Sequence, residues 1–135
     1  MQPLKHAQAP RRTLVFGSFS DTSGSDSPKY RAMARLGLEI ADRVIFVGKK
    51  AEHIKKMLSP ELEGRLFAID SVEAACRLLS GDVVENELVL IKSGVLDHLE
   101  RLIYSQSAEL KCWKATCPKI IDCKQCEESG LMPGD

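Results

Sequence analysis

Four short apolar runs, each followed by a segment with helical periodicity, constrain the fold of this chain more than any other feature. The runs are rich in β-branched and aromatic residues, which favours strands, and their hydrophobicity is nearly continuous. Strands of that kind are typical of parallel sheets with helices on both faces. The pattern therefore predicts an α/β fold, a Rossmann-like three-layer sandwich with a mostly parallel sheet of about four strands. The runs lie at 13–19, 43–48, 65–70 and 87–92.

Apolar residues at helical spacing mark the segments between the runs. In the first helix, Pro28 would occupy the first position, and Ser27 would cap it. The third helix has two possible caps, because Asp70 is spaced for a capping box and Ser71 is the alternative. The helices are expected at 28–41, 51–59, 72–80 and 96–104.

Length and charge limit the classes of function open to the chain. Its 135 residues suit one domain with a short appendage, and its 19 basic and 19 acidic residues balance. That balance creates no general field for nucleic acid or an anionic membrane, so we expect neither as a partner. No apolar stretch approaches the roughly 20 residues of a membrane span, and the polar start contains no signal-like segment. We therefore expect a cytoplasmic protein.

A change of composition near the C-terminus divides the chain into parts. Residues 1–11 are a polar lead-in, 12–106 form the expected α/β domain, and 107–135 form a small cysteine-rich tail. Four of the five cysteines lie in this tail. Cys76 instead lies on an apolar helical stripe, so we expect it to be a buried and inert thiol.

The tail cysteines have the number and spacing of a metal site. They form a C-x4-C-x5-C-x2-C array, in which four thiolates can surround one tetrahedral Zn²⁺ ion. A structural zinc ion would stabilise a segment that is too short to form its own hydrophobic core. Trp113 would then pack against the main domain. An iron–sulfur cluster and free thiols are the alternatives, whereas disulfides are disfavoured in a reducing cytosol. The expected ligands are Cys112, Cys117, Cys123 and Cys126.

The turn after the fourth strand is a candidate binding site. The carboxyl ends of parallel strands meet at one edge of the sheet, where such folds bind ligands. Lys92, Ser93 and Gly94 could meet an anion there, such as a carboxylate or a phosphate. The other interpretation is a plain turn, in which the glycine supplies conformational freedom and the lysine reaches solvent. His98, close by in sequence, is a further candidate for a ligand-facing residue, although a lone histidine supports little.

The loop after the first strand is a second candidate at the same edge. Its sequence "GSFSDTSGSDS" contains Ser18 and Asp21, and its backbone amides could cradle a phosphate. The loop matches neither the P-loop pattern nor the dinucleotide-binding pattern. A flexible loop is the alternative, because serine, glycine and aspartate are also the usual residues of turns.

Three stretches together resemble the C-terminal domain of the Mur ligases, and in particular the D-alanyl-D-alanine-adding, MurF-like branch. The resemblance covers about residues 11–105, and the cysteine tail is similar to an extension of some MurF-like proteins. The stretches are "RRTLVFGSFSDTSGSDSPKYRAMARLGLEIADRVIFVG", "RLFAIDSVEAACRLL" and "ELVLIKSGVLDHLERLI".

The resemblance implies a role in an ATP-dependent amide ligase of bacterial peptidoglycan biosynthesis. In that family a central domain binds ATP, and the C-terminal domain contacts the nucleotide and the incoming amino acid or dipeptide. A carboxylate is activated as an acyl phosphate, which an amine then attacks. This chain would position the amine-bearing substrate through Lys92, Ser93 and the 18–26 loop. ATP and Mg²⁺ would come from an ATP-binding central domain or a partner protein, because the chain cannot be catalytic alone.

One departure from the family pattern favours a second hypothesis. The family motif K-G-S-R aligns with Lys92-Ser93-Gly94-Val95. Valine therefore replaces an arginine that could form two parallel hydrogen bonds to a substrate carboxylate. The alternative function is a non-catalytic interaction module, in which the α/β body is a scaffold and the zinc tail docks on a partner. An independent nucleotide-binding enzyme is the least favoured, because no complete phosphate-binding motif or acid–base pair is present.

Overall fold

A four-stranded sheet, in which every neighbouring pair of strands is parallel, forms the centre of the molecule. The strands are β1 (Arg12–Phe16), β2 (Arg43–Val47), β3 (Leu66–Ile69) and β4 (Leu88–Lys92), in the spatial order β3-β2-β1-β4. The predicted α/β, Rossmann-like fold with a parallel sheet is therefore confirmed. The computed structural model describes residues 10–18, 26–81, 86–92, 97–106, 109–114, 117–119, 122–123, 126 and 129–130.

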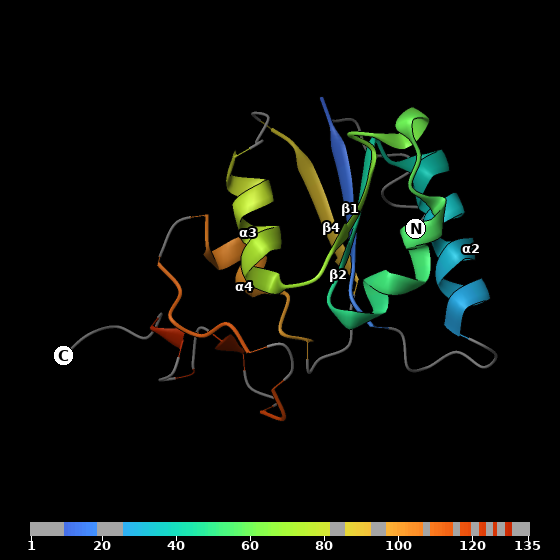
Figure 1. Ribbon diagram of the computed structural model, residues 1–135. Helices are drawn as coiled ribbons and strands as arrows, with labels where there is room; N and C mark the ends of the chain where they lie inside the picture. Colours follow the sequence, from blue (N-terminus) through green and yellow to red (C-terminus); the bar gives the residue numbers. More distant parts are fainter. Residues whose placement is uncertain are drawn as a thin grey trace.

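Helices cover both faces of this sheet (Figure 1). On one face lie α2 (Asp26–Ile40) and the 3₁₀ segment η1 (Lys49–Met57), and a short 3₁₀ turn, η2 (Pro60–Leu62), precedes β3. On the other face lie α3 (Val72–Gly81) and α4 (Arg101–Tyr104), with the tail below them. No helix in the part of the chain that the structure describes combines the length and apolar character needed to cross a membrane.

The alternation of side chains along β1 builds two cores. Leu14 and Phe16 pack under α2, whereas Val15 points to the opposite face and packs with residues of α3 and α4. Gly37 allows α2 to approach the sheet closely, because a Cβ atom there would lie 3.1 Å from both Leu14 Cδ2 and Val44 Cγ2. The two cores fix the sheet between its helical layers.

Buried charges connect the amino ends of the strands. Arg43 is 1% exposed, yet its guanidinium lies 3.1 Å from Glu87 Oε2 and donates to Thr13 Oγ1 at 3.2 Å. Glu87 also accepts a hydrogen bond from Arg11. Because the partners come from β1, from β2 and from the residue before β4, this cluster helps to hold the central strands in register.

Several element boundaries differ from the sequence expectations. The expected Ser27 cap is wrong, because α2 begins at Asp26, and the short helix expected at 51–59 is instead the 3₁₀ segment η1. The amide of Ala74 bonds to Ser71 Oγ at 3.1 Å, so the cap of α3 is the serine. The last helix begins at Arg101 and not at 96, because His98 has a left-handed φ of 49° that a helix cannot accommodate.

Candidate metal centre and crevice

The four tail cysteines lie around one small cavity. Cys117, Cys123 and Cys126 are buried, Cys112 is half-buried, and all four are free thiols. The cavity has a volume of about 10 Å³, which is too small for an organic ligand. Its lining is completed by His98, Arg101, Lys119 and Ser129.

Distances between donor atoms place a mixed group beside the cysteines. In the described part of the chain, His98, Glu100 and Cys123 are the three potential ligands whose donor atoms all lie within 4.8 Å of one another. No three of the four cysteine sulfurs meet that criterion, so a tetrahedral site made of the four sulfurs would need a rearrangement of the tail. The residues present can therefore hold a metal ion.

Hydrogen bonding decides which donors suit an ion better. Both ring nitrogens of His98 face acceptors, with Nδ1 at 2.8 Å from Glu100 Oε2 and Nε2 at 2.6 Å from the Lys119 carbonyl oxygen. Both ring nitrogens are thus directed at protein oxygens within the described structure. The sulfur atoms are soft donors that suit zinc, and Lys119 Nζ lies 3.5 Å from Cys126 Sγ, where it can balance thiolate charge.

The turn before α4 and the start of that helix hold the tail in place. Arg101 is 1% exposed and donates to the carbonyl oxygens of Cys112 and Lys114 at 3.0 and 2.8 Å. The same guanidinium donates to the carbonyl oxygens of Asp97 and His98 at 3.0 and 2.9 Å. One buried side chain thus joins the tail to the end of the β4–α4 connection.

The Glu100 carboxylate organises the backbone and thiol of Cys123. Glu100 Oε2 accepts from the Cys123 amide at 3.1 Å. Burial, which is the largest cause, and the hydrogen bond to Glu100 together raise the pKa of the Cys123 thiol to about 12. Burial also acts to raise the pKa of Glu100, but the hydrogen bonds from His98 and Cys123 outweigh it and hold that pKa below its ordinary value. Without metal, Cys123 is thus a protonated thiol that donates to a carboxylate.

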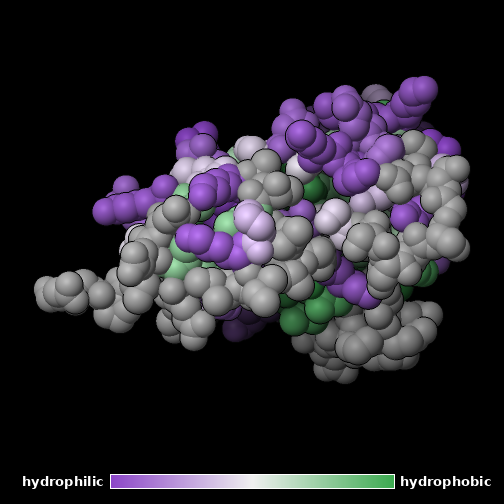
Figure 2. Space-filling view, turned by 90° about the horizontal axis from the view of Figure 1, so that it is seen from below, coloured by the Kyte–Doolittle hydropathy of each residue, from purple (hydrophilic) through white to green (hydrophobic). Residues whose placement is uncertain are grey.

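A second cavity, which we call the crevice, lies at the carboxyl ends of the strands. Its volume is about 250 Å³, and residues that follow all four strands contribute to it. Asp97 forms part of its wall and accepts hydrogen bonds from the amide and hydroxyl of Ser18 at 2.8 and 2.7 Å. Figure 2 looks at the molecule from this lower edge. The crevice is lined by Ser18, Val47, Gly48, Lys49, Lys50, Asp70, Ser71, Val72, Asp97 and Trp113.

The crevice carries both signs of charge and an aromatic wall. Lys49 and Lys50 supply cations, whereas Asp70 and Asp97 supply carboxylates. Trp113 comes from the tail and packs against the core on the α3 face, as the sequence predicts. A zwitterion, with one ammonium and one carboxylate, finds partners of opposite charge in such a cavity.

The predicted site residues have different positions. Ser18 lines the crevice, whereas Lys92 lies at the end of β4 with an exposed side chain and does not line it. Lys92 pairs with Phe16, which points to the α2 face of the sheet, while the crevice opens on the other face. His98 is 3% exposed, bonds to the Lys119 carbonyl oxygen in the tail and does not line the crevice. Asp21, Ser93 and Gly94 lie outside the described residues.

The sequence places the 48–50 loop at this edge of the sheet without selecting a site residue in it, and it selects neither Asp70 nor Trp113 for the crevice. Lys49 and Lys50 follow β2, Asp70 follows β3, and Trp113 reaches the crevice from the tail. The position of the first three directly after strands is a usable signal, because every strand of a parallel sheet ends at the same edge. Nothing in the local sequence marks Trp113, which reaches the crevice only through the docking of the tail on α4.

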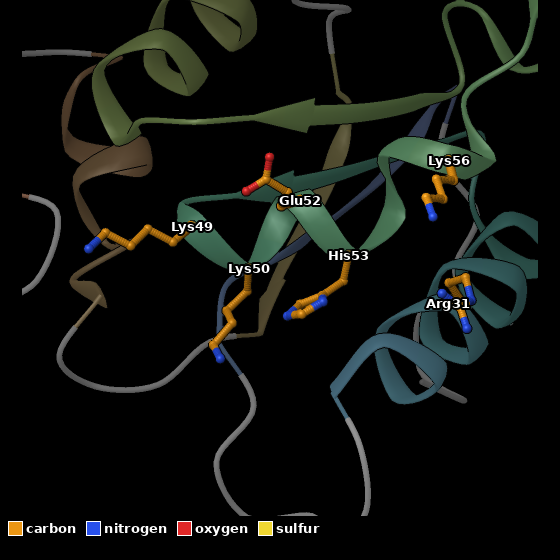
Figure 3. Close-up of a pocket in the computed structure, with 6 residues that line it drawn as sticks. All are labelled: Arg31, Lys49, Lys50, Glu52, His53 and Lys56. Carbon is orange, nitrogen blue, oxygen red and sulfur yellow. The ribbon is translucent and has the colours of Figure 1, made fainter.

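A third cavity, which we call the basic groove, lies between α2 and η1. Its volume is about 470 Å³. Figure 3 shows Lys56 extending toward Arg31, with Lys50 and His53 on the same side of η1. Lys49 and Glu52 also belong to the lining, but their side chains point in other directions.

Comparisons with known proteins give no family for the chain. No family model, no curated protein and no solved structure matches it significantly.

Proposed function

We propose that the chain is the substrate-positioning, C-terminal domain of a MurF-like ATP-dependent amide ligase. The observation that carries the proposal is the crevice, because it lies where all four parallel strands end and contains both carboxylates and ammonium groups. A dipeptide such as D-alanyl-D-alanine presents the complementary pair of charges. Asp70 would bind its ammonium group, and Lys49 or Lys50 would bind its carboxylate in place of the family arginine that Val95 replaces.

The chain's own residues would bind and orient the amine, and the activation of the other substrate would take place elsewhere. ATP and Mg²⁺ would be held by a central domain or a partner protein, which would form the acyl phosphate. Trp113 would exclude water from one side of the bound dipeptide, since its indole is a large apolar wall. A cytoplasmic location follows from this role and keeps the tail thiols reduced.

Two measurements test this function. Binding of D-alanyl-D-alanine is measured by calorimetry and by the fluorescence of Trp113, the only tryptophan of the chain. Asp70→Asn should weaken binding about tenfold, whereas Glu61→Gln, outside the crevice, should not. The second measurement adds the chain to a MurF-like ligase that lacks its own C-terminal domain and follows dipeptide-dependent phosphate release from ATP. No binding and no stimulation together would reject the function.

We also propose that Cys112, Cys117, Cys123 and Cys126 hold one structural zinc ion. The support is the shared cavity, the soft donor set and the charges of Arg101 and Lys119 close to the thiols. Metal analysis of the purified protein should give one zinc per chain. Cys123→Ser should lose it, and Cys76→Ser, which alters the fifth cysteine, should retain it. A brown protein with visible absorption would instead indicate an iron–sulfur cluster.

The alternative function is a non-catalytic interaction module built on the same zinc-bound tail. The position of Lys92 favours it, because the exposed side chain does not line the crevice where the ligase family would need it. This alternative predicts that Lys92→Ala leaves partner binding unchanged and that Cys123→Ser abolishes it. The opposite pattern would reject the interaction module.

A further inference from the structure

The basic groove is the largest of the described cavities and has no place in the ligase proposal. Its 470 Å³ falls within the range of small-molecule sites, about 300 to 1,000 Å³. One wall is α2, which contributes Arg31, and the other is η1, which contributes the remaining lining residues (Figure 3). A groove between two elements can therefore receive a ligand of moderate size.

The charge of the groove is strongly one-sided. Arg31, Lys50 and Lys56 supply its cations, whereas Lys49 belongs to the lining but points away from them (Figure 3), and the chain as a whole has a formal net charge of +0. Lys56 extends toward Arg31 in Figure 3, and neither side chain makes an ion pair with any residue that the structure describes. Cations placed together in a concave site repel each other and raise the local concentration of anions.

Glu52, the one acid among the described lining residues, does not neutralise these cations. Glu52 is exposed and points away from Arg31 and Lys56 in Figure 3. Its carboxylate lies 3.6 Å from Lys55 Nζ, and Lys55 does not line the groove. The positive potential between Arg31 and Lys56 is therefore left for an external anion.

An aromatic stack fixes the floor of the groove. The imidazole of His53 stacks on the ring of Tyr30, with centroids 5.2 Å apart and an interplanar angle of 27°. Tyr30 is fully buried and packs in turn against Phe46, at a centroid distance of 6.1 Å. A site with a fixed floor loses less conformational entropy on binding than a set of independent lysines.

We propose that the basic groove binds a diphosphate group. Several cations in one concavity suit a multiply charged anion better than a single carboxylate, and the fork of Arg31 matches the oxygens of a phosphate. Lys49 and Lys50 line both the groove and the crevice, so the two cavities adjoin along η1. A ligand anchored by its diphosphate in the groove can thus extend toward the crevice. The proposal does not depend on the ligase function, because the groove itself supplies every contact.

Calorimetric titration of the full chain with inorganic pyrophosphate tests the proposal. Binding should be measurable at low ionic strength and weaken as salt is added. Arg31→Glu and Lys56→Glu should each reduce the affinity about tenfold or more. Arg35→Glu is the matched control, since Arg35 lies one turn further along α2 and outside the groove, and it should change the affinity little. Circular dichroism of each variant verifies that the fold is retained.

Two further titrations, with ADP and with orthophosphate, show whether the groove recognises a nucleotide and whether it needs two linked phosphates. ADP binding more tightly than pyrophosphate would assign the groove to a nucleotide, and equal affinity would assign it to the diphosphate alone. Orthophosphate should bind more weakly than either, because it carries fewer charges. Absence of pyrophosphate binding, or an equal loss in the Arg35→Glu protein, would overturn the proposal. Neither result bears on dipeptide binding in the crevice, so the two proposals can fail separately.

Discussion

The guanidinium of Arg101 donates a 3.0 Å hydrogen bond to the carbonyl oxygen of Cys112, the first cysteine of the tail. The same side chain bonds to the carbonyl oxygen of Asp97, which lines the crevice, and to that of Lys114. Trp113 lies between two residues that Arg101 holds, and it forms a wall of the crevice. The cysteine-lined cavity and the crevice are therefore parts of one connected structure.

Arg101→Met should loosen this connection. The variant keeps most of the apolar stem but removes the donors of four carbonyl oxygens, and we expect a loss of about 3 kcal/mol in the free energy of unfolding. Urea denaturation followed by circular dichroism measures the loss, and the emission of Trp113 should shift to the red. Arg77→Met, which removes an exposed arginine of α3, is the control and should cost less than about 0.5 kcal/mol.

Glu87→Gln should destabilise the protein through the arginine that it leaves behind. Arg43 is 1% exposed, so its charge would remain buried without a carboxylate, and a loss of about 3 kcal/mol is expected. Thermal and urea unfolding measure the effect. The matched change Glu73→Gln breaks the exposed pair with Arg77 on α3, where a loss of about 0.3 kcal/mol is expected. Similar losses in the two variants would show that the buried cluster has no special role.

The sheet could be predicted from the sequence because each of its strands is marked by a short, continuous run of apolar, strand-forming residues. Runs such as the one ending at Val47 are apolar on both faces, and only a covered parallel sheet buries both. The start of α4 could not be predicted in the same way. His98 adopts a left-handed φ of 49° and bonds to the Lys119 carbonyl oxygen, a contact 21 residues away that no local window contains.

The clustering of the tail cysteines was more predictable from the sequence than the crevice. Cysteine spacing alone brings Cys112 and Cys126 into one set, and the structure places the whole set around one cavity. The crevice depends on the order of the strands and on the docking of the tail, so Asp70 and Trp113 meet only in three dimensions. Lys92 illustrates the remaining difficulty. It lies at the carboxyl-terminal edge of the sheet, as expected, but this position does not decide on which face of the sheet its side chain emerges.

Alkaline pH should destabilise the protein through Cys76. Burial raises the pKa of this thiol above its ordinary value of 9.0, so the native state retains the proton at pH values where the unfolded chain has lost it. The unfolded state then binds fewer protons, and the free energy of unfolding falls as the pH rises above about 9. Cys76→Ala should show a shallower decline over that range in urea denaturation. An unchanged slope would contradict the assignment of the decline to this thiol.

Removal of the metal should free the tail while leaving the sheet intact. If the cysteines hold zinc as proposed, a chelator takes that ion away, but none of the tail cysteines belongs to the two hydrophobic cores. We expect far-ultraviolet circular dichroism to change little, the emission of Trp113 to shift to the red, and its quenching by acrylamide to increase. The thiol reagent dithiobis(nitrobenzoate) should then react with four thiols, those of Cys112, Cys117, Cys123 and Cys126.

Cys76 provides the internal control for that experiment. It is 4% exposed, its Sγ lies 3.7 Å from the Arg101 carbonyl oxygen, and burial raises its pKa, so it should react only when the whole domain unfolds. Two reaction steps are thus expected, the first on chelation and the second in denaturant. Reaction of the tail thiols at full rate before any chelator is added would contradict a bound ion. Simultaneous reaction of all five cysteines would instead show that the tail and the core unfold as one unit.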